Sequence, residues 1–481
     1  MNYVLLIIKI IILINSIIAL WTVFKKQRTI STTWAWLLTL IIFPICGFLL
    51  YSFLGRGIDN KSKKIIKQAT IPDNQKNYIN SSIKAYEKRL ESRDGVFSQY
   101  LMTTENVIFT QNNKISFYYN GKDKFDRLFK DLYNAKETIH VEYYSFFNDN
   151  IGRKFVSILE MKAKEGVKIR LIYDPWGSGG NHKEFFKKLI SNGGIVIPFI
   201  TSKNFITKRR LNYHLHRKIV VIDGMISWTG GFNVGDQYMG HSKKFGFWRD
   251  THGRIFGYGT HIIQETFIKD WNASISNKEY FIKYSKLLFP EISSAYFDNK
   301  IKIYTLSSGP DSNRYTIRNA FLQVFMSAKK LIWIQTPYLV PDDAIYTAIS
   351  VALQKGVSVK IMIPNMPDHP FIFRATQYYA NLLHKEGAEI YLYDKGFIHA
   401  KTIVIDDRIS IFGSTNQDVR SYELNFEISS FIDDENINQE FKNQYKLDID
   451  NSKLLTDAMI NEQNIWLKFK QHFSRLISPI L

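Results

Sequence analysis

Two long apolar runs dominate the hydrophobic pattern at the start of the chain. Residues 3–24 are almost wholly Ile, Leu and Val apart from Lys9, and residues 34–53 are again apolar and carry no charged side chain. Each run has about the 20 residues that a helix needs to cross the hydrocarbon core of a bilayer. Lys9 lies near one end, where a long side chain can reach the lipid headgroups. The pattern therefore predicts two transmembrane helices within residues 1–54, joined as a hairpin.

Basic residues indicate which side of the membrane holds the rest of the chain. The segment between the two spans carries fewer basic residues than the segment after the second span, and basic segments beside a span stay preferentially in the cytoplasm. We therefore expect a multi-pass protein of the cell membrane in which the domain that follows the two spans lies in the cytoplasm. The residues compared are Lys25, Lys26 and Arg28 in the turn, and Arg56, Lys61, Lys63, Lys64 and Lys67 beyond it.

Strands and helices alternate beyond a basic, polar connector at 55–113. One succession of strand, helix and strand is followed much later by a second with the same order. Such alternation predicts an α/β fold with two pseudo-symmetric α-β-α halves, at 114–300 and 301–446, that form one catalytic body. The paired segments are strands at 138–147 and 331–339, helices ending at Gly166 and Gly356, and strands at 167–173 and 357–363.

The last segment, 447–481, has the pattern of an amphipathic helix. Its apolar residues recur at helical spacing, with basic residues between them. This pattern is found more often in a helix packed on a catalytic body than in one lying on lipid, and both interpretations stay open. The apolar residues are Ile465, Phe469, Phe473 and Leu476, and the basic ones are Lys468, Lys470 and Arg475.

Both halves contain the same short motif after their repeated strands. The first copy reads HRKIVVID at 216–223, and the second reads HAKTIVID at 399–406. Each is followed at the same interval by a Gly-Gly or Gly-Ser pair and an asparagine, so four residue types recur at matched spacing. The matched residues are His216, Lys218, Asp223 and Asn233 in the first copy, and His399, Lys401, Asp406 and Asn416 in the second.

Histidine, lysine and asparagine together suit chemistry at a phosphodiester. A neutral imidazole can attack phosphorus, while an ammonium group and an amide can hold the non-bridging oxygens as negative charge develops. His216 and Lys218 are two residues apart on a predicted strand, so their side chains share a face. A two-residue hairpin loop, at 224–225 in the first copy and at 407–408 in the second, would then bring Asn233 opposite His216. One histidine can then be the nucleophile and the other the acid and base. This scheme needs no metal and no cofactor.

A histidine nucleophile also needs a carboxylate on its far nitrogen to fix its tautomer. Asp223 and Asp406 fall on the opposite face of their strands, so we interpret them as structural. Asp250, in WRD after the first motif, and Glu427, in NFE after the second, are better candidates to orient the histidines.

Composition narrows the partners of the chain. The 63 Lys and Arg residues against 44 Asp and Glu give a formal charge of +19, which favours an anionic partner such as an acidic lipid surface or a nucleic acid. Cys46 is the only cysteine, so the sequence excludes an intrachain disulfide and a cysteine metal cluster.

The two motifs resemble the paired HKD motifs of the phospholipase D superfamily. Further stretches, GFNVGD at 231–236, WRDTH at 248–252, QTPY at 335–338 and RSYELNFE at 420–427, are similar to those of bacterial cardiolipin synthases. The resemblance implies phospholipase D-like halves and a phosphatidyl transfer between two phosphatidylglycerol molecules that yields cardiolipin and glycerol. It also implies that phosphatidylglycerol, cardiolipin and anionic membrane lipids are the partners.

The resemblance carries roles onto individual residues of this chain. It implies that His216 is the nucleophile and His399 the acid and base, and that Asn233 and Asn416 bind the substrate phosphate. The catalytic set that it implies is His216, Lys218, Asp223, His399, Lys401 and Asp406.

Two other functions fit some of the same observations. A phospholipase D-type hydrolase or another head-group transferase would use the same motifs, with water or a different alcohol as acceptor. A membrane-anchored nuclease or nucleic-acid binder would suit the charge and the 27 Tyr. The predicted hairpin favours lipid synthesis, because it holds the site at the surface where both lipid substrates reside, and we expect no nucleic-acid partner.

Overall fold

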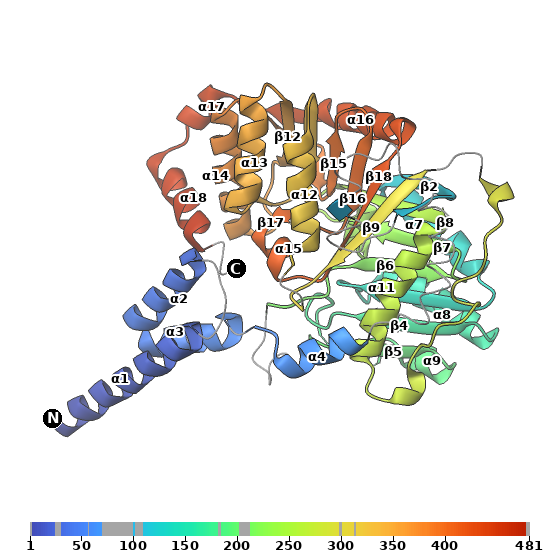
Figure 1. Ribbon diagram of the computed structural model, residues 1–481, viewed down its shortest axis with the longest axis horizontal. Coiled ribbons are helices and arrows are strands. Elements are labelled where there is room, and N and C mark those ends of the chain that lie inside the picture. The colour runs from blue at the N-terminus through green and yellow to red at the C-terminus, as the bar shows by residue number, and fades with distance from the viewer. Residues whose placement is uncertain are drawn as a thin grey trace.

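A computed structural model gives the arrangement of the chain (Figure 1). It describes residues 2–24, 30–55, 57–69, 100–101, 109–180, 184–201, 212–297, 301–311 and 314–477. Most of the connector predicted at 55–113 lies outside the described residues.

The first half is built around a mixed sheet. Its strands are β2 (Asn113–Asn120), β3 (Thr138–Tyr143), β4 (Lys168–Tyr173), β5 (Ile195–Pro198), β6 (Lys218–Ile222), β7 (Ile226–Gly230), β8 (Phe247–Gly257) and β14 (Gly396–Ile398). Their order is β14-β8-β7-β6-β3-β4-β5, and β2 also pairs with β8. β3, β4 and β5 run parallel, whereas β6 is antiparallel to both β3 and β7.

The second half repeats this sheet. Its strands are β1 (Phe109–Thr110), β9 (Lys302–Ser308), β10 (Leu331–Gln335), β12 (Ser358–Pro364), β13 (Glu389–Tyr393), β15 (Thr402–Ile405), β16 (Ile409–Gly413), β18 (Glu427–Asp433) and β19 (Ser452–Leu454). Their order is β1-β9-β18-β16-β15-β10-β12-β13-β19, and a separate pair joins β11 (Leu339–Val340) to β17 (Gln417–Asp418). Within this order, the run β9-β18-β16-β15-β10-β12-β13 matches β2-β8-β7-β6-β3-β4-β5 of the first half strand for strand. The predicted α/β fold with two halves is therefore confirmed.

Helices cover both faces of each sheet, and Figure 1 shows several of them over the second sheet. The α-helices of the first half are α7 (Gly121–Tyr133), α8 (Asn150–Lys164), the short α9 (Lys187–Ser191) and α11 (Gly259–Ser274). Those of the second are α12 (Thr316–Ser327), α13 (Asp343–Gln354), α14 (Pro370–Lys385), α15 (Val419–Glu423) and α16 (Glu435–Ile449). Short 3₁₀ turns occur at η2 (Asp236–Met239), η3 (Lys278–Tyr280) and η4 (Ser294–Tyr296).

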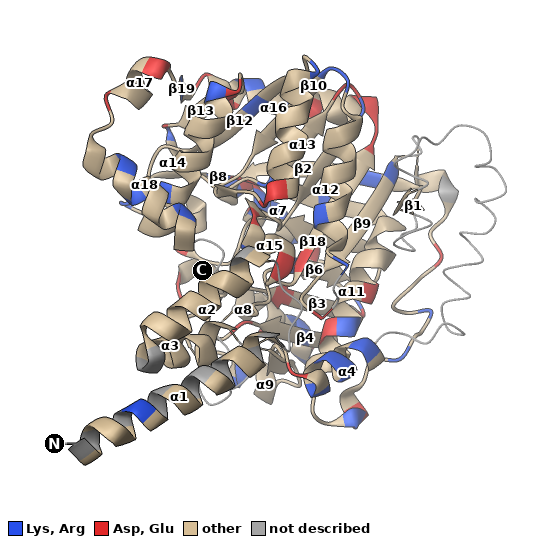
Figure 2. Ribbon diagram, turned by 60° about the vertical axis from the view of Figure 1, so that its left-hand side comes forward, with Lys and Arg blue, Asp and Glu red and all other residues tan. Residues whose placement is uncertain are grey.

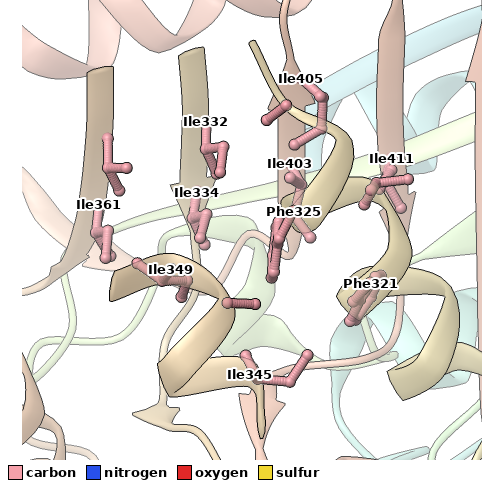
Figure 3. Packing of buried hydrophobic residues seen from close by; sticks show 14 of the residues in the cluster. Phe321, Phe325, Ile332, Ile334, Ile345, Ile349, Ile361, Ile403, Ile405 and Ile411 are labelled. Atoms are coloured by element: carbon pink, nitrogen blue, oxygen red, sulfur yellow. The ribbon is translucent and has the colours of Figure 1, made fainter. Parts of the chain in front are cut away.

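Buried apolar clusters hold these layers together. On the outer face of the second sheet, side chains of α12 and α13 meet isoleucines of β10, β12, β15 and β16, as Figure 3 shows. The strands alternate, so their other side chains face inward. Val221 of β6, Val404 of β15 and Phe412 of β16 belong to one buried cluster, which joins the two halves into a single body.

The N-terminal apolar runs form several helices. The first run is α1 (Asn2–Phe24), and the second is divided into α2 (Ile30–Ile42), α3 (Pro44–Leu50) and a π-helical turn, η1 (Tyr51–Gly55). The break falls at Pro44, whose ring nitrogen has no hydrogen to donate to α2. Within the part of the chain that the structure describes, no helix is both long enough and apolar enough to cross a membrane. A further short helix, α4 (Asn60–Gln68), leads to the body.

The C-terminal segment is not one helix. Residues predicted to form a single amphipathic helix at 447–481 contain the end of α16, the strand β19, a short helix α17 (Asp457–Asn461) and α18 (Ile465–Ile477). β19 pairs with β13 and so extends the second sheet. Of these elements, α18 carries the predicted amphipathic pattern. The segment before it belongs to the body instead, since Leu455, beside β19, is buried in the core of the second half.

Candidate active site

A cleft between the two halves brings both motifs together. It has a volume of about 760 Å³ and lies where the parallel strands β3 and β10 end, as ligand sites of α/β sheets commonly do. His216 and Asn233 line it from the first half, and His399 and Asn416 line it from the second. Tyr144, Trp176, His214, Tyr238, Trp248, Tyr338, Asp368, His369, Asp418, Arg420 and Asn425 are among the other residues of its wall.

Each catalytic-motif histidine is tied by its backbone to the opposite half. The amide of His216 donates to the carbonyl of Phe426 at 2.9 Å, and the amide of Phe426 donates to the carbonyl of His214 at 2.9 Å. In the second motif the amide of His399 donates to the carbonyl of Arg249 at 2.7 Å. The segment before each motif therefore runs beside the segment that leads to the other half's carboxylate, as an isolated bridge at Leu215 in the first motif and as β14 paired with β8 in the second.

This crossing pairs each histidine with a carboxylate from the other half. His216 Nδ1 lies 2.8 Å from Glu427 Oε1 and 3.0 Å from Oε2, and His399 Nδ1 lies 2.7 Å from Asp250 Oδ2. A carboxylate can only accept, so each Nδ1 carries hydrogen and each Nε2 presents its lone pair. Asp250 and Glu427 thus contact the histidines as the sequence predicts, but each contact runs between halves.

The two carboxylates are themselves held in place. Ser414 Oγ donates to Glu427 Oε2, and Asn425 Nδ2 donates to Oε1 at 3.4 Å. In the first half the amide of Thr251 donates to Asp250 Oδ1 at 2.7 Å. A methyl group on Gly231 would lie 2.0 Å from that same oxygen. Gly231 and Ser414 occupy equivalent motif positions, so the Gly-for-Ser difference leaves room for the Asp250 carboxylate.

Burial keeps both histidines neutral. Burial lowers the pKa of His216 to about 4, against the opposing effect of Glu427. Burial and the nearby Lys401 ammonium lower the pKa of His399 to about 4, against the opposing effect of Asp250. At neutral pH each ring is therefore an unprotonated imidazole. A bound anionic phosphate would raise both pKa values, because a negative charge favours the imidazolium form.

The two lysines lie beside their histidines. Lys218 Nζ donates to the carbonyl of His216, and Lys401 Nζ lies 2.9 Å from His399 Nδ1. Burial lowers the pKa of Lys218 to about 7 and that of Lys401 to about 8. A substrate phosphate would restore their full charge by the same electrostatic effect, so these ammonium groups respond to an anion in the cleft.

The two asparagines differ in their contacts. Asn233 accepts a hydrogen bond from the amide of Ser145 at 3.2 Å and donates to the hydroxyl of Tyr238 at 3.2 Å. Asn416 Oδ1 is buried and has no hydrogen-bond partner among the described residues. Both side chains line the cleft, where an amide group can donate to a phosphate oxygen.

The hairpin of each motif differs from its predicted register by one residue. Ile222 pairs with Ile226 and Ile405 pairs with Ile409, so the loops have three residues rather than two. The predicted loops at 224–225 and 407–408 are therefore wrong. Asp223 and Asp406 begin these loops with φ angles of 52° and 51°, a left-handed conformation that aspartate tolerates better than most residues.

Asp223 and Asp406 lie at the far ends of their strands from the histidines and are not among the residues that line the cleft. The carboxylate of Asp223 accepts from the amides of Lys136, Glu137 and Thr138 at 2.8 to 2.9 Å. That of Asp406 accepts in the same way from the amides of residues 329–331. The two aspartates therefore do not belong to the catalytic set in which the resemblance placed them. Each carboxylate closes the loop before the repeated strand.

The substitution Asp223→Asn should lower stability while leaving the chemistry intact. An amide has one acceptor oxygen and no charge, so the three amide hydrogen bonds weaken, and we expect a loss of about 1–3 kcal/mol in the free energy of unfolding. Thermal unfolding in detergent checks this, with turnover measured well below the midpoint. Full stability together with loss of turnover would show that Asp223 acts in the reaction.

Sequence reasoning missed Arg217, the variable residue of the first motif. Its side chain is buried, ion-pairs with Asp270, and donates to the carbonyls of Glu427 and Ser308 at 3.1 Å. Arg217 thus fixes the strand that carries the partner of His216. The available signal was its position on the face opposite His216 and Lys218, where a charged residue in an apolar strand needs a buried partner.

Comparison with known proteins places this fold and site in a class. A family model described as "Cardiolipin synthase, PLD-like domain" matches residues 128–248 and 321–449, and one described as "Phospholipase_D-nuclease N-terminal" matches residues 16–56. The crystal structure of phosphatidylserine synthase from Haemophilus influenzae has a similar fold, with a TM-score of 0.61 and 15% identity, over 80% of this chain and all of that one. The chain is thus a phosphatidyltransferase of the phospholipase D superfamily.

Curated relatives define the family more closely. Cardiolipin synthase of Listeria welshimeri is 40% identical over 486 residues, and the major cardiolipin synthase of Bacillus subtilis is 40% identical over 480, with 98% of both chains covered in each case. Cardiolipin synthase of Staphylococcus aureus is also 40% identical, over 98% of this chain and 95% of that one. The chain belongs to the cardiolipin synthases.

Proposed function

We propose that this enzyme joins two phosphatidylglycerol molecules into cardiolipin and glycerol through a phosphatidyl group held covalently on His216. The observation that carries the proposal is the cleft, where two neutral imidazoles from different halves face the same space. One ring can attack while the other handles the proton, and a single phosphodiester needs both.

In the first step His216 Nε2 attacks phosphorus, and the bond from phosphorus to the glycerol oxygen breaks. His399, charged once the phosphate is bound, gives its Nε2 proton to the departing glycerol. Glu427 stabilises the positive ring of His216 through the Nδ1 contact. Asn233 and Asn416 line the cleft, and Lys218 and Lys401 lie beside the two histidines. We assign these four side chains to the charge on the non-bridging oxygens.

In the second step a hydroxyl of another phosphatidylglycerol replaces the histidine. His399, now neutral, takes the hydroxyl proton as the oxygen bonds to phosphorus and the bond to His216 Nε2 breaks. Atoms and charge balance over both steps, and His399 returns to its protonated form. The overall reaction is reversible, since it exchanges one phosphodiester bond for another of similar energy.

We also propose that the N-terminal region anchors the enzyme in the cell membrane as a hairpin, with the catalytic body in the cytoplasm. The two apolar runs and the matched N-terminal family model at 16–56 support an anchor. So do the many exposed apolar side chains of α1 to α3, among them Leu5, Leu13, Trp21, Trp34, Leu38, Ile41 and Leu49. Anionic lipids are then both the surroundings and the substrates.

Incubation of the purified enzyme with phosphatidylglycerol alone tests the proposed reaction. We expect cardiolipin and glycerol in equal amounts. The same rate is expected after treatment with a chelator, because the lysines and asparagines supply the positive and donor groups that a metal would offer. Thin-layer separation of the lipids and an assay for glycerol measure both products.

Other products of this incubation would change the assignment. Phosphatidic acid without cardiolipin would identify a hydrolase. A divalent-ion requirement that persists in detergent after purification would contradict the metal-free mechanism.

A further inference from the structure

Helix α18 turns its apolar side away from the protein. At about 100° per residue, the exposed large apolar side chains of this helix fall within one stripe roughly 100° wide, whereas the half-buried Leu467 lies on the inner side. Gln471 and Ser474, which are buried, lie on the opposite side of the helix. The exposed fractions of the apolar residues are 87% for Ile465, 60% for Trp466, 55% for Phe469, 46% for Phe473 and 69% for Leu476.

Polar contacts hold the inner side of α18 against the body. Gln471 donates to Gln463 at 3.1 Å and accepts from Asn381 of α14 at 3.4 Å. The guanidinium of Arg475 lies 5.0 Å from the ring centroid of Tyr378, also on α14. A helix on the surface of a soluble body normally packs its apolar side inward. In α18 the apolar side faces outward instead, and an exposed apolar stripe of this kind is typical of a surface that binds another molecule or a membrane.

The chemistry of α18 suits a lipid surface as that partner. Residues 465–477 include Lys468, Lys470 and Arg475 and contain no Asp or Glu. Trp466 and Phe469 stack within the stripe, with ring centroids 5.3 Å apart. Aromatic rings in an apolar stripe, with basic residues beside it, are typical of helices that lie at the headgroup boundary of anionic membranes.

The position of α18 relates this surface to the catalytic cleft. Ser474 lines the cleft, as do Pro370 and Phe371 at the start of α14, against which α18 packs. Figures 1 and 2 show α18 on the same side of the body as α1 to α3, and Figure 2 shows basic residues along it. A bilayer that receives the stripe would therefore lie at the mouth of the cleft.

We propose that the apolar stripe of α18 docks on the anionic bilayer and holds the cleft mouth at the headgroups from which the lipid substrate enters. This inference rests on the proposed function, since a lipid substrate is what requires the cleft at the membrane. The sequence interpretation of a helix packed on the body holds for the inner side of α18, and the interpretation of a helix on lipid applies to its outer side.

A fluorescent probe at Phe469 tests the docking directly. In a Cys46→Ser background, Phe469→Cys carries a polarity-sensitive fluorophore, and the full chain is reconstituted in vesicles of phosphatidylglycerol and phosphatidylethanolamine. We expect blue-shifted emission that loses at least about half its intensity when the acyl chains are brominated near the headgroups. Leu447→Cys is the matched control, because Leu447 is 59% exposed and lies on α16, which Figure 1 shows away from α18, so its label should not respond.

Absence of quenching at Phe469 in vesicles that hold active enzyme would overturn the proposal. A disulfide that links two copies through Phe469→Cys, with no quenching, would overturn it in favour of a second copy as the occupant of the stripe.

The double substitution Phe469→Glu with Phe473→Glu tests the consequence for turnover. The ratio of activity in vesicles to activity in mixed micelles should fall at least about tenfold, because two buried rings are lost from the interface. Leu447→Glu should leave this ratio unchanged. An unchanged ratio for the double variant would overturn the role of α18 alone, whereas failure of the unaltered enzyme to make cardiolipin in micelles would overturn the proposed function.

Discussion

Replacement of His216 by alanine is expected to abolish turnover with every phosphatidyl donor, whereas replacement of His399 should spare the first release of a leaving group that needs no proton. His216 forms the bond to phosphorus, so its loss should reduce the rate by at least about 10⁴. His399 supplies a proton to glycerol, so its loss should reduce the rate with phosphatidylglycerol by about 10² to 10⁴.

Two donors separate these roles. Phosphatidylglycerol releases a poor leaving group, and phosphatidyl-p-nitrophenol releases a good one that departs unprotonated. The first release of p-nitrophenol from each enzyme molecule in mixed micelles should survive in His399→Ala and disappear in His216→Ala. The opposite pattern would exchange the two roles. Equal loss in both variants with both donors would contradict a division of labour between the rings.

The substitution Glu427→Gln is expected to reduce turnover by about 10³ to 10⁴ with little effect on folding. A glutamine amide can donate to His216 Nδ1, which would place the ring hydrogen on Nε2, where the lone pair must attack. Because the His216–Glu427 contact crosses between halves, the loss would arise from a residue 211 positions away in the chain.

The pH dependence distinguishes this effect from general damage. Glu427 opposes the burial that lowers the pKa of His216, so removing the carboxylate should lower that pKa further. The acid limb of kcat/KM should therefore move to lower pH in Glu427→Gln. Asp250→Asn is the matched variant for His399, and it should be partly rescued by the p-nitrophenol donor. A Glu427→Gln enzyme with unchanged turnover would show that this carboxylate does not orient the nucleophile.

Much of the site could be predicted from the sequence because its pattern is local. The repeated motif, the alternation of strands and helices and the outward face of Asp223 each depend on residues a few positions apart. The crossed pairing of His216 with Glu427 and of His399 with Asp250 depends on how the halves dock, which no local spacing encodes. The loop register was wrong because Asp223 and Asp406 adopt a left-handed conformation that adds one residue to each turn.

The C-terminal segment shows a second limit of sequence reasoning. The helical spacing of Phe469 and Phe473 identifies a stripe, but the same spacing occurs whether the stripe faces a core or a membrane. In the structure the side of α18 that faces the body is the one that carries Gln471 and Ser474, which are buried although they are polar. The contact of Gln471 with Asn381 of α14 is tertiary, so the orientation of α18 could not be predicted from the periodicity.

Detection of a phosphatidyl group on His216 is the most direct test of the covalent mechanism. The enzyme is mixed with phosphate-labelled phosphatidylglycerol and quenched rapidly, and its peptides are separated. We expect acid-labile, base-stable label on the peptide that contains His216, no label in His216→Ala, and net retention of configuration at a chiral phosphorus. Absence of any adduct together with inversion at phosphorus would mean direct transfer between the two lipids, and would contradict the phosphohistidine intermediate.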